Sequence, residues 1–194
     1  VYQIFPRVAE DVSLPSVGQD TVSRGRTFDI TSWNLDWFGW PDTTRGPVDK
    51  ARQRRSVRQA MDSISADLYA LQEITSQESL SAITDSIRGT YASLYATDVP
   101  SEQKMAYVYN TSTITPVSSG LAVNGGAQAW ANGRFPFKLS FNATIAGNTR
   151  RYVIFNLHGK ATGQGTEMDD YQRRKTDAET FHAYLRDFYA DSTV

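Results

Sequence analysis

The chain has 194 residues, a formal net charge of -1 at pH 7 and no cysteine, which excludes disulfides, thiolate metal sites and thiol nucleophiles. The near-neutral charge provides no global attraction for nucleic acid, so binding of a polyanion would need a local patch. His158 and His182 are the two histidines, and they lie too far apart for His-x-x-x-His zinc spacing. Any metal ion is therefore expected to be held mainly by oxygen. No apolar run approaches the roughly 18 residues that a membrane span needs.

The first 26 residues are interpreted as an N-terminal extension or linker, because prolines and a glycine interrupt them and no hydrophobic period is sustained. Residues 27–194 are expected to form one domain. The chain begins with Val1 and shows no signal segment, which is typical of a processed or excised product. A secreted or periplasmic location is the expectation that follows.

The first half of the domain predicts the order strand, helix, strand, helix. Residues 28–37 alternate as a strand, 51–65 place apolar side chains at helical spacing, and 67–72 form a short apolar strand. Thr75 and Glu78 then stand in capping-box spacing at the start of a second helix.

The second half predicts a run of β strands and a last helix. Residues 91–96, 104–110, 134–145 and 151–158 are rich in aromatic and β-branched residues, with glycine-containing turns between them. A helix is expected over about 169–189, with an apolar stripe along one face. This order indicates an α/β (α+β) fold with helices packed outside the sheets.

Polar residues end the first two predicted strands. In an extended strand Asn34 and Asp36 point the same way, where an amide and a carboxylate could address a hard cation and its waters. Glu73 ends the second strand, and a parallel pairing would bring it beside them at the carboxyl edge of the sheet. Turn formation, or an ordinary charge at a strand end, remains an alternative for each residue.

Two further segments offer groups for a phosphate. Alternation in the last strand places Asn156 and His158 on one face, and an imidazole there could contact a phosphoryl oxygen or exchange a proton. Arg134 follows a turn at a strand start, where a guanidinium could clamp phosphate. A structural histidine and a surface ion pair are the competing interpretations. His182 is interpreted as structural.

Together these four segments resemble the endonuclease/exonuclease/phosphatase superfamily with the deoxyribonuclease I-like fold. The matches, over about residues 28–190, are Trp-Asn-x-Asp at 33–36, Leu-Gln-Glu at 71–73, Arg-x-Pro at 134–136 and Asn-x-His at 156–158. The resemblance implies a four-layer αββα sandwich of two mainly antiparallel sheets flanked by helices.

The resemblance also implies site roles. Glu73 matches a metal ligand, Asn34 a residue that positions metal or phosphate, and Asp36 a position that assists the metal in one branch. His158 matches a phosphate-contacting or proton-donating histidine, and we expect Arg134 and Asn156 to bind substrate beside it. The implied cofactor is Mg²⁺, with Mn²⁺ or Ca²⁺ as alternatives.

The sequence departs from the superfamily pattern after the last helix. The later Gly-Asp-x-Asn strand and the terminal Ser-Asp-His of such proteins are absent. We therefore expect the fold to be incomplete at its C-terminus, comprising the N-terminal two thirds of the domain, with the water-activating residues in a missing part.

The expected function is that of a metal-dependent phosphodiesterase of nuclease (endonuclease) type, acting as a monomer on nucleic acid or another phosphodiester. One alternative is a phosphomonoesterase, or a phosphodiesterase that acts on lipid or inositol headgroups. The other is a non-catalytic binding module that retains the fold.

Overall fold

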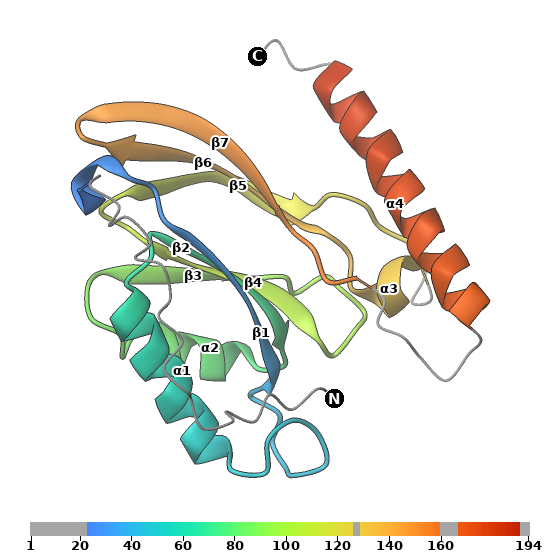
Figure 1. The fold of residues 1–194 in the computed structure, drawn as a ribbon, viewed down its shortest axis with the longest axis horizontal. Coiled ribbons are helices and arrows are strands. Elements are labelled where there is room, and N and C mark those ends of the chain that lie inside the picture. Colours follow the sequence, from blue (N-terminus) through green and yellow to red (C-terminus); the bar gives the residue numbers. More distant parts are fainter. Residues whose placement is uncertain (1–22, 126–128, 160–166, 191–194) are drawn as a thin grey trace, which may run out of the picture.

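The computed structural model describes residues 23–125, 129–159 and 167–190 (Figure 1). Almost all of the predicted N-terminal extension lies outside these residues. The helices and strands follow one another as a 3-10 turn η1 (Arg24–Arg26), β1 (Ile30–Phe38), α1 (Lys50–Ile64), β2 (Leu68–Ile74), α2 (Gln77–Thr84), β3 (Tyr91–Tyr95), β4 (Lys104–Asn110), β5 (Ile114–Leu121), α3 (Ala129–Gly133), β6 (Phe137–Ile145), β7 (Asn148–Asn156) and α4 (Glu167–Ala190).

The strands form two sheets. The first has the order β1-β2-β4-β3 and the second the order β5-β6-β7. β1 and β2 run parallel, with Asn34 opposite Gln72, and the remaining pairs are antiparallel. The predicted parallel pairing is therefore confirmed, and the carboxyl ends of β1 and β2 meet at one edge of the first sheet.

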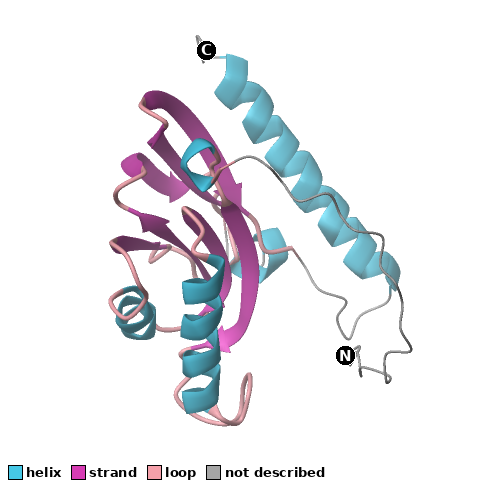
Figure 2. Cartoon of the chain, turned by 60° about the vertical axis from the view of Figure 1, so that its left-hand side comes forward, coloured by secondary structure: helices cyan, strands magenta, loops and turns pink. Residues whose placement is uncertain are grey.

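The elements stack in four layers. α1 and α2 cover one face of the first sheet, the second sheet packs against its other face, and α4 lies on the far side of the second sheet (Figures 1 and 2). This arrangement confirms the predicted αββα sandwich. The layer between the sheets is filled by side chains such as Leu68, Tyr107, Leu139 and Phe141, all less than 2% exposed.

A second apolar layer holds α1 and α2 against the first sheet. Met61 of α1 and Leu80 of α2 are each 1% exposed, and they belong to one cluster with Phe38 and Leu71 of the sheet. Burying a side chain of this size contributes about 1.5–3 kcal/mol. This packing fixes the two helices on the sheet that carries Asn34 and Glu73.

The cap of α2 differs from the prediction. Ser76, and not Thr75, is the N-cap, and its side chain accepts a hydrogen bond from Ser79 N at 3.1 Å. The capping box expected from Thr75 and Glu78 is therefore wrong by one residue. Thr75 Oγ1 instead donates to Phe38 O at 2.9 Å, which joins the ends of β1 and β2.

Two boundaries in the second sheet also differ. β6 begins at Phe137, because α3 and a short connection occupy the residues before it. β7 ends at Asn156, so His158 follows the strand and does not share its alternation. β5 and α3 had no counterpart in the prediction.

The last helix packs on the second sheet through aromatic rings. Phe155 of β7 contacts Phe181, Tyr184 and Phe188 of α4, with ring centroids 5.2, 6.0 and 6.3 Å apart. Trp130 of α3 also contacts Phe181, at 5.7 Å. These contacts confirm the predicted helix and place α4 beside α3. Within the described ranges, none of the helices has both the length and the apolar character required to cross a membrane.

Candidate active site

The ends of β1 and β2 are both irregular at the same level of the sheet. The pairing register shifts between Asn34 and Phe38 on β1, and between Leu71 and Ile74 on β2. Asp36, Trp37 and Glu73 have φ values of 52°, 54° and 60°. Left-handed backbone costs about 1–2 kcal/mol per non-glycine residue, and such residues persist where the surrounding contacts determine them. Irregularities of this kind re-aim side chains at the edge of a sheet.

Asn34 and Glu73 meet at this edge. Asn34 Nδ2 donates to Glu73 Oε1 at 2.9 Å, and the backbone N–H of Trp37 donates to Glu73 Oε2 at 3.2 Å. The Glu73 side chain is 14% exposed. Both carboxylate oxygens are thus oriented by β1, and the convergence expected from the parallel pairing is present.

The geometry of Asp36 differs from the expectation. Its left-handed backbone ends the strand alternation at Leu35, so the argument that Asp36 and Asn34 point the same way does not apply. Asp36 N donates to Asn34 Oδ1 at 2.9 Å, and Gln53 Nε2 donates to Asp36 O at 2.9 Å. Both contacts involve the backbone of Asp36 and not its carboxylate. Its role as a metal ligand stays a prediction.

Arg134 and His158 form the second half of the site. They are 8% and 9% exposed, and Arg134 Nη1 lies 2.6 Å from His158 Nε2. A guanidinium has only donors, so His158 Nε2 accepts this bond and the ring proton lies on Nδ1. His158 Nε2 lies 3.6 Å from Glu73 Oε1, so this pair lies beside Glu73.

Burial dominates the electrostatics of this pair. Burial, assisted by the Arg134 guanidinium, lowers the pKa of His158 to about 4, although the Glu73 carboxylate lies nearby. Burial also lowers the pKa of Arg134, while Glu73 and Asp177 oppose this effect. At neutral pH the site therefore contains a neutral imidazole, a guanidinium and one carboxylate.

Asn156 lies beneath the site and links the two sheets. It is 2% exposed; its Oδ1 accepts from Gln72 Nε2 at 2.6 Å, and its Nδ2 donates to Leu71 O at 2.8 Å and Ala106 O at 3.1 Å. These contacts hold the segment before His158 against the strand that carries Glu73. A direct contact of Asn156 with substrate stays a prediction.

The oxygen donors at this edge decide what kind of cation it could take. Mg²⁺ prefers oxygen ligands, keeps several waters and is commonly held by one or two carboxylates. Glu73 supplies one carboxylate at a partly exposed edge. Asn34 turns its Nδ2 toward Glu73, and its amide oxygen accepts from Asp36 N, so Asn34 orients the carboxylate. In the described part of the chain, no group of three or more His, Asp or Glu side chains lies close enough to hold a metal ion. A hard cation bound at this edge would therefore have Glu73 as its carboxylate ligand and would keep several waters.

Two glutamines of the site were not predicted. Gln103 Oε1 accepts from Arg134 Nη1 at 3.1 Å, and Gln72 is the partner of Asn156. Gln72 stands inside the Leu-Gln-Glu match, where its position next to Glu73 was the available signal. Gln103 lies in a connection before β4, where no pattern distinguishes it.

Comparison with known proteins identifies the fold. No protein-family model matches the sequence, and no curated protein matches it. Solved structures do match. The mannosyl-6-phosphatase of Bacteroides thetaiotaomicron VPI-5482 is similar with a TM-score of 0.61 and 15% identity, over 87% of this chain and 62% of that one.

Two other solved structures agree. An endonuclease/exonuclease/phosphatase family protein from Bacteroides thetaiotaomicron matches with a TM-score of 0.58 and 15% identity, over 86% of this chain and 58% of that one. A humanized D. rerio TDP2 matches with a TM-score of 0.55 and 13% identity, over 82% and 56%. The chain thus has the deoxyribonuclease I-like fold of endonuclease/exonuclease/phosphatase proteins. It spans about three fifths of the length of these structures.

Proposed function

We propose that the protein is a metal-dependent phosphate-ester hydrolase, and that it cleaves phosphodiester bonds as a nuclease of endonuclease type. The observation that carries this proposal is the convergence of Glu73, Asn34, Arg134 and His158, from four separate segments, at one edge of the sandwich. A carboxylate for a hard cation beside a guanidinium for an anion is the combination that phosphoryl transfer requires. The fold shared with the solved structures supports the same conclusion.

Each side chain has a role that follows from its contacts. Glu73, with Asn34, would hold Mg²⁺, which when bound supplies Lewis-acid stabilisation of a phosphate oxygen. Arg134 would bind the phosphoryl oxygens, and its partial burial strengthens such a charge-assisted bond. His158 and Gln103 accept from Arg134 and fix the plane of its guanidinium.

A phosphomonoesterase is the second candidate. It is favoured by the similarity to the mannosyl-6-phosphatase, whose name denotes removal of phosphate from a sugar. The two candidates share the metal and the guanidinium and differ in the group that surrounds the phosphate. Plasmid DNA and mannose 6-phosphate, tested side by side with the same preparation, distinguish them.

The test of the proposal is the variant Glu73→Gln. It keeps the size of the side chain and removes the charge that would hold the cation. Mg²⁺-dependent hydrolysis should fall by roughly 100-fold or more, because metal stabilisation is worth several kcal/mol. Glu78→Gln, at an exposed glutamate on α2, is the matched control and should leave turnover unchanged.

Two results would contradict the proposal. Unchanged turnover in Glu73→Gln, with the circular dichroism of the native fold, would remove Glu73 from the active site. Absence of Mg²⁺-dependent hydrolysis of plasmid DNA, bis(p-nitrophenyl) phosphate and mannose 6-phosphate by the full-length protein would favour a binding module.

A further inference from the structure

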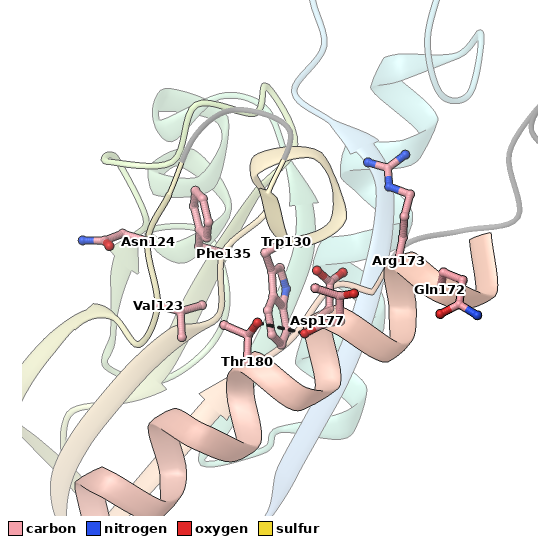
Figure 3. Close-up of a pocket in the computed structure, with 9 residues that line it drawn as sticks. Val123, Asn124, Trp130, Phe135, Gln172, Arg173, Asp177 and Thr180 are labelled. Carbon is pink, nitrogen blue, oxygen red and sulfur yellow. Dashed lines mark hydrogen bonds between the residues drawn. The ribbon is translucent and has the colours of Figure 1, made fainter. Parts of the chain in front are cut away.

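Helix α4 reaches the site through Asp177. Asp177 Oδ2 accepts a hydrogen bond from the backbone N–H of Ala131 at 3.0 Å, across 46 positions of the chain. Asp177 and Trp130 line one pocket of about 270 Å³ between α3 and α4, and Figure 3 shows them side by side. Glu73, Asn34, Arg134 and His158 are not among the residues that line this pocket.

The turn that Asp177 holds is conformationally costly. Trp130, Ala131 and Asn132 have φ values of 37°, 47° and 64°, and Gly133 follows at 80°. Three consecutive non-glycine residues in the left-handed region cost about 1–2 kcal/mol each. Such a turn persists only where the surrounding contacts determine it. Trp130 and Ala131 belong to the buried core cluster, and α4 adds contacts from the other side. Trp130 packs on Phe181, and Arg173 donates to Asn132 Oδ1.

The same turn positions Arg134. Arg134 Nε donates to Ala131 O at 2.7 Å, while Arg134 Nη1 reaches His158 Nε2. The residue Ala131 is therefore held at both ends: its N–H by Asp177 and its carbonyl by Arg134. A shift of Ala131 would therefore also move the carbonyl oxygen that accepts from the Arg134 guanidinium.

Charge supports this connection. Arg134 interacts favourably with two carboxylates, Glu73 on β2 and Asp177 on α4, and unfavourably with Arg173 on α4. Burial raises the pKa of Asp177, while the Ala131 amide, Arg173 and Arg134 oppose this effect. Asp177 therefore acts on Arg134 both through the turn and directly through its charge.

We propose that Asp177 is a positioning residue: by accepting from Ala131 N–H, it holds the left-handed turn whose carbonyl places Arg134 beside His158 and Glu73. Its consequence for catalysis rests on the proposed function, in which Arg134 binds phosphate. α4 is then required for the geometry of the active site and contributes no group to the substrate.

The structural part of this inference is tested without activity. In ¹⁵N-labelled protein, the Ala131 amide should be protected from hydrogen exchange, and Asp177→Ala should accelerate its exchange by about 10-fold or more. The Nε–H signal of Arg134 should shift in the same variant. Asp177→Asn retains an oxygen that can accept from Ala131 and should keep most of the protection. Comparing the two variants separates loss of this hydrogen bond from a general loss of folding in Asp177→Ala.

Glu179→Ala provides the control on the same helix, because Glu179 is exposed and contacts Lys175 four residues before it. It should leave both signals at their native values. Unchanged exchange of Ala131 in Asp177→Ala, or equal changes in Asp177→Asn and Asp177→Ala, would overturn the inference.

Activity provides the second arm. With bis(p-nitrophenyl) phosphate and Mg²⁺, Asp177→Ala should lower kcat/KM by roughly 10- to 100-fold, because misplacement of a binding group by about 1 Å has effects of this size. Asp177→Asn should recover most of this loss. Native protein that hydrolyses nothing would contradict the proposed function alone, since the exchange data still decide the role of Asp177.

Discussion

Asn34 Nδ2 and Glu73 Oε1 are 2.9 Å apart although 39 positions separate them in the chain. The parallel pairing of β1 and β2 brings the two residues to one edge, and irregular backbone at Asp36, Trp37 and Glu73 aims their side chains at each other. The Asn34 amide donates to one oxygen of the Glu73 carboxylate and satisfies it in place of a cation. The Asn34–Glu73 contact should therefore respond both to a change of charge at Asn34 and to added metal ion.

Asn34→Asp tests that sensitivity. The substitution places two carboxylates within hydrogen-bond distance, so we expect a lower melting temperature in EDTA, corresponding to about 1–3 kcal/mol. Mg²⁺ should raise this melting temperature more than that of the native protein, because two carboxylates bind the ion better than one. Asn34→Ala removes the donor without adding charge and should gain less from Mg²⁺. Equal responses of the two variants to Mg²⁺ would contradict the prediction.

The site residues that belong to regular strands could be predicted from the sequence. Asn34 lies within β1 and Glu73 near the end of β2, and parallel pairing brings the carboxyl halves of the two strands together, so local patterns were sufficient. Arg134 and His158 lie in connections outside the strands, and their proximity followed from the resemblance to a family rather than from periodicity.

The remaining features depend on tertiary contacts that no local pattern encodes. The Gln72–Asn156 pair joins residues 84 positions apart. The left-handed conformation of Trp130 and Ala131 opposes the preference of those residue types, and contacts with the core, α4 and Arg134 hold it. Asp177 stands four residues before Phe181, on the face of α4 that packs on α3, and no local pattern in the sequence indicates that its partner is the Ala131 amide.

Asn156→Ala should destabilise the fold strongly. The substitution leaves Leu71 O and Ala106 O without the buried donor that they share, and an unsatisfied buried polar group costs about 1–3 kcal/mol. We expect a loss of about 2–4 kcal/mol in the free energy of unfolding measured with urea. Asn124→Ala, at an exposed asparagine, should change it by less than about 0.5 kcal/mol. A small effect at Asn156 would show that water replaces its amide.

Acid should destabilise the metal-free protein through His158. The pKa of this imidazole is about 4 in the folded chain and about 6.5 when unfolded, so between these values the unfolded chain binds the additional proton. The stability that His158 contributes above pH 6.5 is therefore lost as the pH falls. The loss levels off below about pH 4. The loss is at most on the order of 3 kcal/mol.

This pH dependence has a direct control. Arg134 and Glu73 are the charged groups that contact the ring, so the measurement is made in EDTA to keep Glu73 free of metal. His158→Asn should flatten the dependence of the free energy of unfolding between pH 4 and 6.5, while the exposed His182→Asn should not. Identical slopes for His158→Asn and the native protein would assign the acid sensitivity to other groups.

Gly46→Ala should disturb the active site, although Gly46 is not itself one of the site residues. Gly46 has a φ of 64°, and an added Cβ would lie 2.6 Å from Asp36 O and 3.0 Å from Trp37 Cβ. The neighbours must shift, and they include the residue whose N–H donates to Glu73 Oε2. We expect a loss of about 1–2 kcal/mol in stability, together with lower Mg²⁺-dependent turnover. Gly120→Ala is the control, since its Cβ would meet nothing within 4 Å, and it should leave turnover unchanged. Native turnover in Gly46→Ala would mean that the contact between Trp37 and Glu73 is dispensable for the proposed reaction.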